Sequence, residues 1–215
     1  MAISIIHNQD TRFLNAELLD SEGFCRVLPA QTLMDIDINI FRLWCVQNAV
    51  YLYPTLELVE WLKKFINNRN AIEVGSGNGH LGHALGIKMT DSGMQMRPEI
   101  MLQYKLLGQA CTCPPDCVEI LDAENAVAKY KPDVVIASWL THKWKSGMST
   151  GNMYGPDESM IIANTEHYIH IGNDSVHWEK PIMSIEHQIE YFPWIVSRAS
   201  NVTGNHAAIW GNITS

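Results

Sequence analysis

The sequence predicts an α/β fold: a mostly parallel sheet with helices on both faces, a C-terminal antiparallel hairpin and an N-terminal helical extension. Three observations predict it. From residue 71 onward, short apolar runs rich in β-branched residues alternate with helix-like segments, which is typical of parallel sheets. A dense glycine run, GSGNG at residues 75–79, directly follows the first apolar run. Near the end, two apolar runs flank a polar turn at residues 201–205.

Length and composition describe an ordinary globular chain. Its 215 residues fit one domain with an added segment, which we divide into an extension at 1–50 and a main domain at 51–215. The longest uncharged run, Leu43–Leu56, is too short and too polar to cross a bilayer. The first residues lack the basic start and long apolar core of a signal peptide. We therefore expect a cytoplasmic protein without a membrane partner.

The charge balance bears on possible partners. Fifteen basic and 23 acidic residues give a formal net charge of −8, and no run is rich in lysine or arginine. Non-specific nucleic-acid binding depends largely on neutralising phosphates, so there is no strong nucleic-acid signal here. Five cysteines, an odd number, indicate free thiols in a reducing compartment.

The first 70 residues are expected to be mostly helical. Between residues 30 and 50, apolar side chains recur at helical spacing, although the alternating MDIDI at 34–38 leaves a strand open there. Pro54 keeps its predecessor out of the helical region and suits the first turn of a helix that runs to about Asn67.

The sheet is expected to contain five parallel strands and a hairpin. The closing hairpin would pair Trp194–Ser200 with Ala207–Trp210. The five parallel strands are expected at Ala71–Val74, Ile87–Thr90, Val118–Leu121, Val134–Ser138 and His167–Ile171.

The register of the glycine run separates two kinds of nucleotide-like cofactor. A dinucleotide fingerprint, G-x-G-x-x-G, places its first glycine directly after the strand, but His80 stands where the third glycine should be. Sliding the pattern to Gly77, Gly79 and Gly82 recovers it, with two extra residues in the turn. This shift weakens a reading as a nicotinamide-dependent oxidoreductase.

The string from Glu73 to Gly79, acid-x-Gly-x-Gly-x-Gly, resembles motif I of the class I S-adenosylmethionine (SAM)-dependent methyltransferases. The resemblance covers about residues 51–215, because that family has a Rossmann-like sheet of five parallel strands capped by a terminal hairpin. It implies that Gly75, Gly77 and Gly79 lie against the methionine part of SAM, and that Glu73 helps to hold the turn. A glycine turn without a ligand remains the alternative.

Two acidic residues stand at the carboxyl ends of neighbouring predicted strands, and open parallel sheets bind their ligands just outside these ends. Asp91 closes the second strand, sixteen residues after Gly75, and the resemblance implies that it accepts both ribose hydroxyls. Asp122 closes the third strand, where the family commonly has an acid that accepts from the adenine amino group. Each acid has the alternative role of capping the helix that follows.

The end of the fourth strand is expected to face the methyl acceptor. Amino-directed relatives carry Asn/Asp/Ser-Pro-Pro-aromatic here; this chain keeps Ser138 but lacks the prolines, which leaves the acceptor open. Trp139 could stack on a planar substrate or attract the sulfonium. His142 is the expected general base, because its ordinary pKa lies near neutral pH. For Trp139 and His142, core packing or surface exposure is the alternative.

Two loops are expected to complete the site. Tyr53 and Thr55 belong to a segment that resembles the aromatic-Pro-Thr stretch that relatives lay against the amino-acid end of SAM, with a plain helix start as the alternative. Residues 151–158 place two glycines around an aromatic residue, which suggests either a covering loop or a simple turn before a helix.

The cysteines at 111, 113 and 117 lie in one short loop with the spacing C-x-C-x₃-C. Zinc would need a fourth ligand, and no histidine lies nearby in sequence. We therefore expect free thiols in this loop, and no metal.

Taken with the resemblance, these patterns predict a SAM-dependent methyltransferase whose acceptor is a small molecule or a protein rather than a nucleic acid. The first alternative is a SAM-binding protein that does not catalyse and acts as a sensor or interaction module. A NAD-dependent oxidoreductase is the second.

Overall fold

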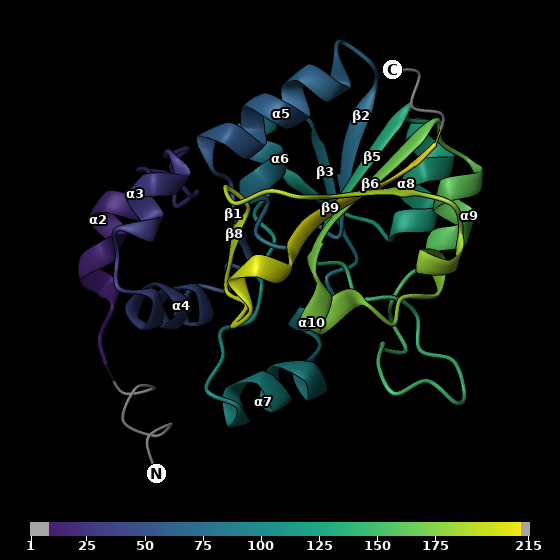
Figure 1. The fold of residues 1–215 in the computed structure, drawn as a ribbon. Coiled ribbons are helices and arrows are strands. Elements are labelled where there is room, and N and C mark those ends of the chain that lie inside the picture. Colours follow the sequence, from purple (N-terminus) through teal and green to yellow (C-terminus); the bar gives the residue numbers. More distant parts are fainter. Residues whose placement is uncertain (1–8, 212–215) are drawn as a thin grey trace.

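The computed structural model describes residues 9–211, and its centre is a seven-stranded sheet (Figure 1). The strand order is β4-β3-β2-β5-β6-β9-β7; neighbours from β4 to β6 run parallel, and β9 is antiparallel to both β6 and β7. The strands of this sheet are β2 (Ala71–Val74), β3 (Lys88–Asp91), β4 (Val118–Ile120), β5 (Val134–Ser138), β6 (His167–Asn173), β7 (Gln188–Tyr191) and β9 (Asn205–Gly211).

Helices connect the parallel strands, so the order of elements follows the expected βα alternation. The α-helices are α2 (Asn15–Leu18), α3 (Ala30–Met34), α4 (Ile38–Gln47), α5 (Leu56–Ile66), α6 (His80–Leu85), α7 (Pro98–Leu106), α8 (Ala123–Tyr130), α9 (Glu158–Ala163) and α10 (Asp174–His177). Short 3₁₀ turns are η1 (Arg12–Leu14), η2 (Met94–Met96), η3 (Pro181–Ser184) and η4 (Val202–Gly204).

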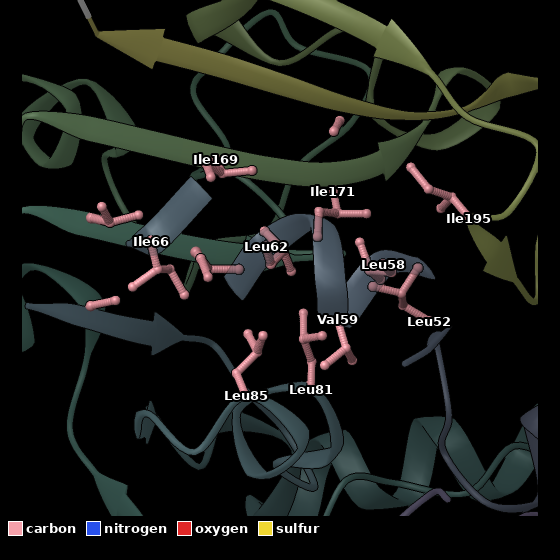
Figure 2. Close-up of a cluster of buried hydrophobic side chains, with 14 of the residues drawn as sticks. Leu52, Leu58, Val59, Leu62, Ile66, Leu81, Leu85, Ile169, Ile171 and Ile195 are labelled. Atoms are coloured by element: carbon pink, nitrogen blue, oxygen red, sulfur yellow. The ribbon is translucent and has the colours of Figure 1, made fainter. Parts of the chain in front are cut away.

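Alternation along the strands builds a core on each face of the sheet. On one face, side chains of α5 and α6 such as Leu62 and Leu81 pack against Ile169 and Ile171 of β6 (Figure 2). On the other face, α8 and α9 cover a second cluster that includes Trp210. Because both faces are covered, the central strands read as nearly continuous apolar runs.

From residue 9 to residue 50 the elements are helical, as predicted; residues 1–8 lie outside the described part of the chain. The alternating MDIDI stretch forms no strand: α3 ends at Met34, and Asp37 caps α4 by accepting from the N–H groups of Asn39 and Ile40. Buried side chains of this segment share one cluster with Tyr53 and Val196. The helix predicted after Pro54 is α5, with Thr55 as its N-cap.

The five parallel strands are confirmed to within about two residues at their ends. The predicted hairpin partner was wrong. Residues 194–200 contain only β8 (Val196–Ser197), which pairs with β1 (Leu52–Tyr53) in a separate two-stranded sheet. The antiparallel neighbour of β9 at the edge is instead β7, whose residues are all exposed. The sequence analysis missed β7 because its alternating run, QIEY, is only four residues long, the shortest stretch in which alternation indicates a strand.

Within residues 9–211, no helix combines the length and the apolar composition that crossing a bilayer requires.

Candidate ligand-binding site

The glycine run forms a tight turn between β2 and α6. Gly75, Gly77 and Gly79 have φ of +61°, +55° and +76°, the left-handed region that glycine enters without strain. A Cβ at Gly75 would collide with the side chain of Leu140, and one at Gly77 would lie 2.9 Å from Thr112 Cγ2. The bare backbone therefore lets two neighbouring segments approach the turn closely.

Asp91 ties this turn to the next strand. Its Oδ2 accepts from the Gly77 N–H at 2.8 Å, and its Oδ1 accepts from the Gly93 N–H at 2.8 Å. Ser76 adds a backbone bond to the Thr90 carbonyl at 3.0 Å. The carboxylate thus sits at the mouth of the turn with lone pairs left for further donors, since each oxygen can accept more than one bond.

Glu73 supports the turn from inside the sheet. It is buried, and its Oε2 accepts from the Gly82 N–H at 2.8 Å, while Ser138 Oγ lies 3.4 Å from its Oε1. Burial raises the pKa of Glu73 to about 8, against the lowering effect of these two hydrogen bonds. At neutral pH this side chain is therefore mostly protonated.

A pocket of about 170 Å³ opens at the carboxyl ends of the central parallel strands. Of the residues selected from the sequence, it brings together seven in its lining: Glu73, Gly75, Gly77, Asp91, Asp122, Ser138 and Trp139. The covering loop contributes Asn152, Tyr154, Gly155 and Pro156.

Asp122 lines the pocket and also caps α8. Its Oδ1 accepts from the Asn125 N–H at 2.8 Å, and its Oδ2 from Asn125 Nδ2 at 2.7 Å. The capping role considered from the sequence is thus present together with pocket exposure. Glu124 in the first turn of α8 lines the pocket beside it and accepts from the Asp157 N–H at 2.8 Å.

Trp139 leaves β5 with φ of +55°, a strained conformation for a bulky residue and one typical of functional sites. Its ring lies between Tyr51, at 6.0 Å, and His177, at 5.3 Å in an edge-to-face arrangement. The Arg198 guanidinium stacks over the Tyr51 ring at 3.7 Å. Tyr51 and Trp139 therefore form an aromatic wall backed by a cation.

Four selected residues do not line the pocket. Tyr53 is buried with its hydroxyl donating to the Leu18 carbonyl at 3.1 Å, and Thr55 Oγ1 donates to the Trp194 carbonyl at 2.9 Å. Tyr51, two residues before Tyr53, lines the pocket instead. Gly79 faces Val118 and Met89.

The fourth of these residues, His142, is buried beneath the covering loop, with its Nε2 directed at Gly151 and without a hydrogen-bond partner. Burial lowers the pKa of His142, and the nearby Lys180 ammonium lowers it further. His80 does line the pocket, but burial lowers its pKa to about 4, so it is neutral near pH 7.

Several lining residues escaped the sequence analysis, namely Asn78, Gln95, Tyr104 and Thr112. Asn78 lies inside the glycine run and could have been found there; it accepts from the Cys113 N–H at 2.8 Å. Gln95, Tyr104 and Thr112 come from the segment between β3 and β4. The one pattern singled out there, the cysteines at 111, 113 and 117, pointed to thiols and not to these side chains.

A buried ion pair stands behind the pocket wall. Lys180 Nζ lies 2.8 Å from Glu158 Oε1 and donates to the Leu140 carbonyl at 2.6 Å, and both charged side chains are almost fully buried. Tyr168 donates to the same Glu158 oxygen at 2.6 Å. Because Leu140 packs on Gly75 and lines the pocket, this pair fixes the wall opposite the glycine turn.

The charged side chains that line the pocket are acidic. Asp91, Asp122 and Glu124 contribute carboxylates, whereas no lysine or arginine belongs to the described lining. Such a pocket favours cationic or neutral groups and disfavours phosphates, since uncompensated like charges repel strongly where water is scarce.

The three cysteines expected to be free are free: Cys113 and Cys117 are exposed and Cys111 is partly buried. Across residues 9–211, no three His, Cys, Asp or Glu side chains gather in a way that could hold a metal ion.

No family model matches this chain, and no curated protein matches it in sequence. Solved structures show distant likeness. The Thermoplasma acidophilum 1320 protein is 17% identical at a TM-score of 0.36, over 86% of this chain and 98% of that one.

Two further structures are similarly distant. A Pyrococcus abyssi tRNA (uracil-54, C5)-methyltransferase in complex with S-adenosyl-L-homocysteine is 12% identical at a TM-score of 0.36, over 72% of this chain and 36% of that one. A mutant of MtNAS is 13% identical at a TM-score of 0.37, over 84% and 67%.

Proposed function

We propose that this protein binds SAM and transfers its methyl group to an acceptor. The observation that carries the proposal is the joint between the glycine turn and Asp91, which sets bare backbone and a carboxylate side by side in one pocket. The turn offers close approach to the methionyl part of SAM, and Asp91 keeps acceptor capacity for the ribose hydroxyls. Asp122 is the proposed partner of the adenine amino group.

The charge of the lining supports SAM over a dinucleotide. SAM brings a sulfonium and an ammonium to a pocket whose charged side chains are carboxylates. NAD would bring a pyrophosphate to the same carboxylates without a lysine or arginine in the described lining to offset it.

Methyl transfer is an in-line displacement at the sulfonium carbon, and most of its rate would come from positioning. Trp139 and Ser138 are the proposed acceptor-facing residues. His142 does not line the pocket, and His80, with a pKa lowered to about 4, is a weak base. The proposed chemistry therefore suits an acceptor that needs no strong base from the protein. The same observation favours, as a second candidate, a SAM-binding protein that does not catalyse.

A melting-shift panel with SAM, S-adenosylhomocysteine (SAH) and NAD tests the proposal, followed by calorimetry with SAH. We expect stabilisation by SAM and SAH and none by NAD. Transfer of labelled methyl from SAM into fractionated extract then separates an enzyme from a silent binder. A shift with NAD alone would replace the proposal with an oxidoreductase.

A further inference from the structure

Helix α7 is the one helix of eight or more residues in the described chain that has no buried side chain. Leu106 is 78% exposed, Leu102 57% and Met101 50%. Figure 1 shows the helix standing apart from the sheet, at the lower edge of the view. A helix that packs so little on its own chain is held mainly by the segments at its ends.

Glycines in the left-handed conformation stand on either side of the segment that contains α7. Gly93 has φ of +65° and Gly108 has φ of +66°. The chain is anchored at the first glycine and just beyond the second: the Gly93 N–H donates to Asp91 Oδ1 at 2.8 Å, and the Ala110 N–H donates to the Val46 carbonyl at 3.1 Å. Residues 94–107 thus form a rigid piece between two positions where the backbone can rotate.

The same segment contributes part of the pocket lining, including Gln95 and Tyr104. Few polar contacts hold this segment against the pocket. Gln95 Nε2 donates to the Tyr51 hydroxyl at 3.1 Å, and the hydroxyls of Tyr51 and Tyr104 lie 3.3 Å apart. Gln95 Oε1 also accepts from the Thr112 N–H at 2.8 Å.

An open groove of about 750 Å³ lies against α7, and the helix contributes Pro98, Met101, Leu102 and Lys105 to its lining. The opposite side consists of Gln47 and residues 108–111. The groove is mostly apolar, so a movement that narrows it would remove apolar surface from water, which is favourable. The groove therefore leaves α7 room to move on this side.

We propose that residues 94–107 form a lid, hinged at Gly93 and Gly108, that closes over a ligand in the pocket and brings Gln95 and Tyr104 onto it. Asp91 holds both the glycine turn and the hinge residue Gly93, so a ligand that engages this carboxylate acts directly on the hinge. The proposal rests on the proposed function only for the identity of the ligand, SAM.

Hydrogen exchange on the full chain, read by mass spectrometry with and without saturating SAH, tests the lid. In the free protein we expect α7 to exchange at least tenfold faster than the packed helix α5, and SAH to slow exchange across residues 93–112. Tyr104→Phe removes one tether and should speed exchange in α7 alone and shorten the residence time of SAH. Leu106→Ala, on the exposed side of the same helix, is the matched control and should change neither.

Binding of SAH, measured by calorimetry on the same sample, separates the two proposals. Heat of binding without any change in exchange at 93–112 overturns the lid and leaves SAM binding intact. If SAH gives no heat, the proposed function fails, and the free protein decides the lid. Three results on the free protein would each overturn the lid. The first is exchange in α7 as slow as in α5, and the second is protection of α7 that rises with protein concentration, as binding of a second copy would cause. The third is that Tyr104→Phe leaves exchange in α7 unchanged.

Discussion

The backbone N–H of Gly77 donates a 2.8 Å hydrogen bond to the carboxylate of Asp91, so the turn after β2 and the end of β3 form one unit. Gly77 needs its left-handed φ to present that N–H, and Asp91 needs the parallel pairing of β2 with β3 to reach it. The other carboxylate oxygen of Asp91, Oδ1, accepts a hydrogen bond from the Gly93 N–H. One side chain therefore organises the turn, the pocket and the start of the proposed lid.

Replacing Asp91 tests its proposed contact with ribose. We expect Asp91→Ala to weaken SAH binding at least about 100-fold, because two hydrogen bonds to a charged group are each worth about 1.5–3 kcal/mol. Isothermal calorimetry measures the affinity, and near-ultraviolet circular dichroism checks the fold. Asp116→Ala, which removes an exposed carboxylate outside the pocket lining, is the control. Unchanged affinity in Asp91→Ala would remove the ribose assignment.

Adding a methyl group at Gly75 tests the closeness of the pocket wall. Both Gly75 and Gly86 have positive φ, so alanine at either position strains the backbone by about 1–2 kcal/mol. At Gly86 the new Cβ meets open space, whereas at Gly75 it collides with Leu140, which lines the pocket. We expect thermal destabilisation in both variants, larger in Gly75→Ala because of the collision, and a loss of SAH affinity of tenfold or more in Gly75→Ala alone. Equal affinities would show that Leu140 gives way freely.

The buried Glu73 predicts a specific dependence of stability on pH. Its pKa rises from 4.5 to about 8 on folding, so between these values the folded state holds a proton that the unfolded state has lost. The stabilisation is fully present below pH 4.5 and is lost as pH rises toward 8, by up to about 1.4 kcal/mol per pH unit.

Glu73→Gln keeps the shape without the titration, so we expect its free energy of unfolding to fall less between pH 5 and 8 than in the parent protein. Urea unfolding at four pH values in this range gives the comparison. The exposed Glu60→Gln should follow the parent profile. Parallel profiles for Glu73→Gln and the parent would mean that Glu73 is ionised throughout.

The Glu158–Lys180 pair predicts a strong coupling between two mutations. Lys180→Met leaves a buried carboxylate without its cation and should destabilise the fold by about 3–5 kcal/mol. Adding Glu158→Gln removes the isolated charge while an oxygen remains for Tyr168, so the double variant should recover most of that loss. Denaturant unfolding of the four proteins in the cycle measures the coupling energy. Additive losses would mean that the pair does not act as a unit.

Much of the fold could be predicted because strand and helix periods are local. The β-branched runs at Ala71–Val74 and Val134–Ser138 predicted the exact bounds of their strands. Pro54, expected in the first turn of a helix, lies two residues before the start of α5 at Leu56. The edge strand β7 was missed because its alternation of polar and apolar residues spans only four positions, Gln188–Tyr191, all of them exposed. Pairing of β8 with β1 joins segments far apart in the chain, which no local pattern encodes.

The residues around the pocket also fall into those that the sequence could predict and those that it could not. By itself, the sequence determined the residues that follow strand ends, such as Gly75, Asp91 and Trp139, because the carboxyl ends of parallel strands meet along one edge of a sheet. Only the tertiary structure decided that Tyr51 rather than Tyr53 lines the pocket, and that His142 does not. The direction of a side chain in a loop depends on what packs around it, and for Tyr53 and His142 the surrounding contacts hold each side chain inside the protein.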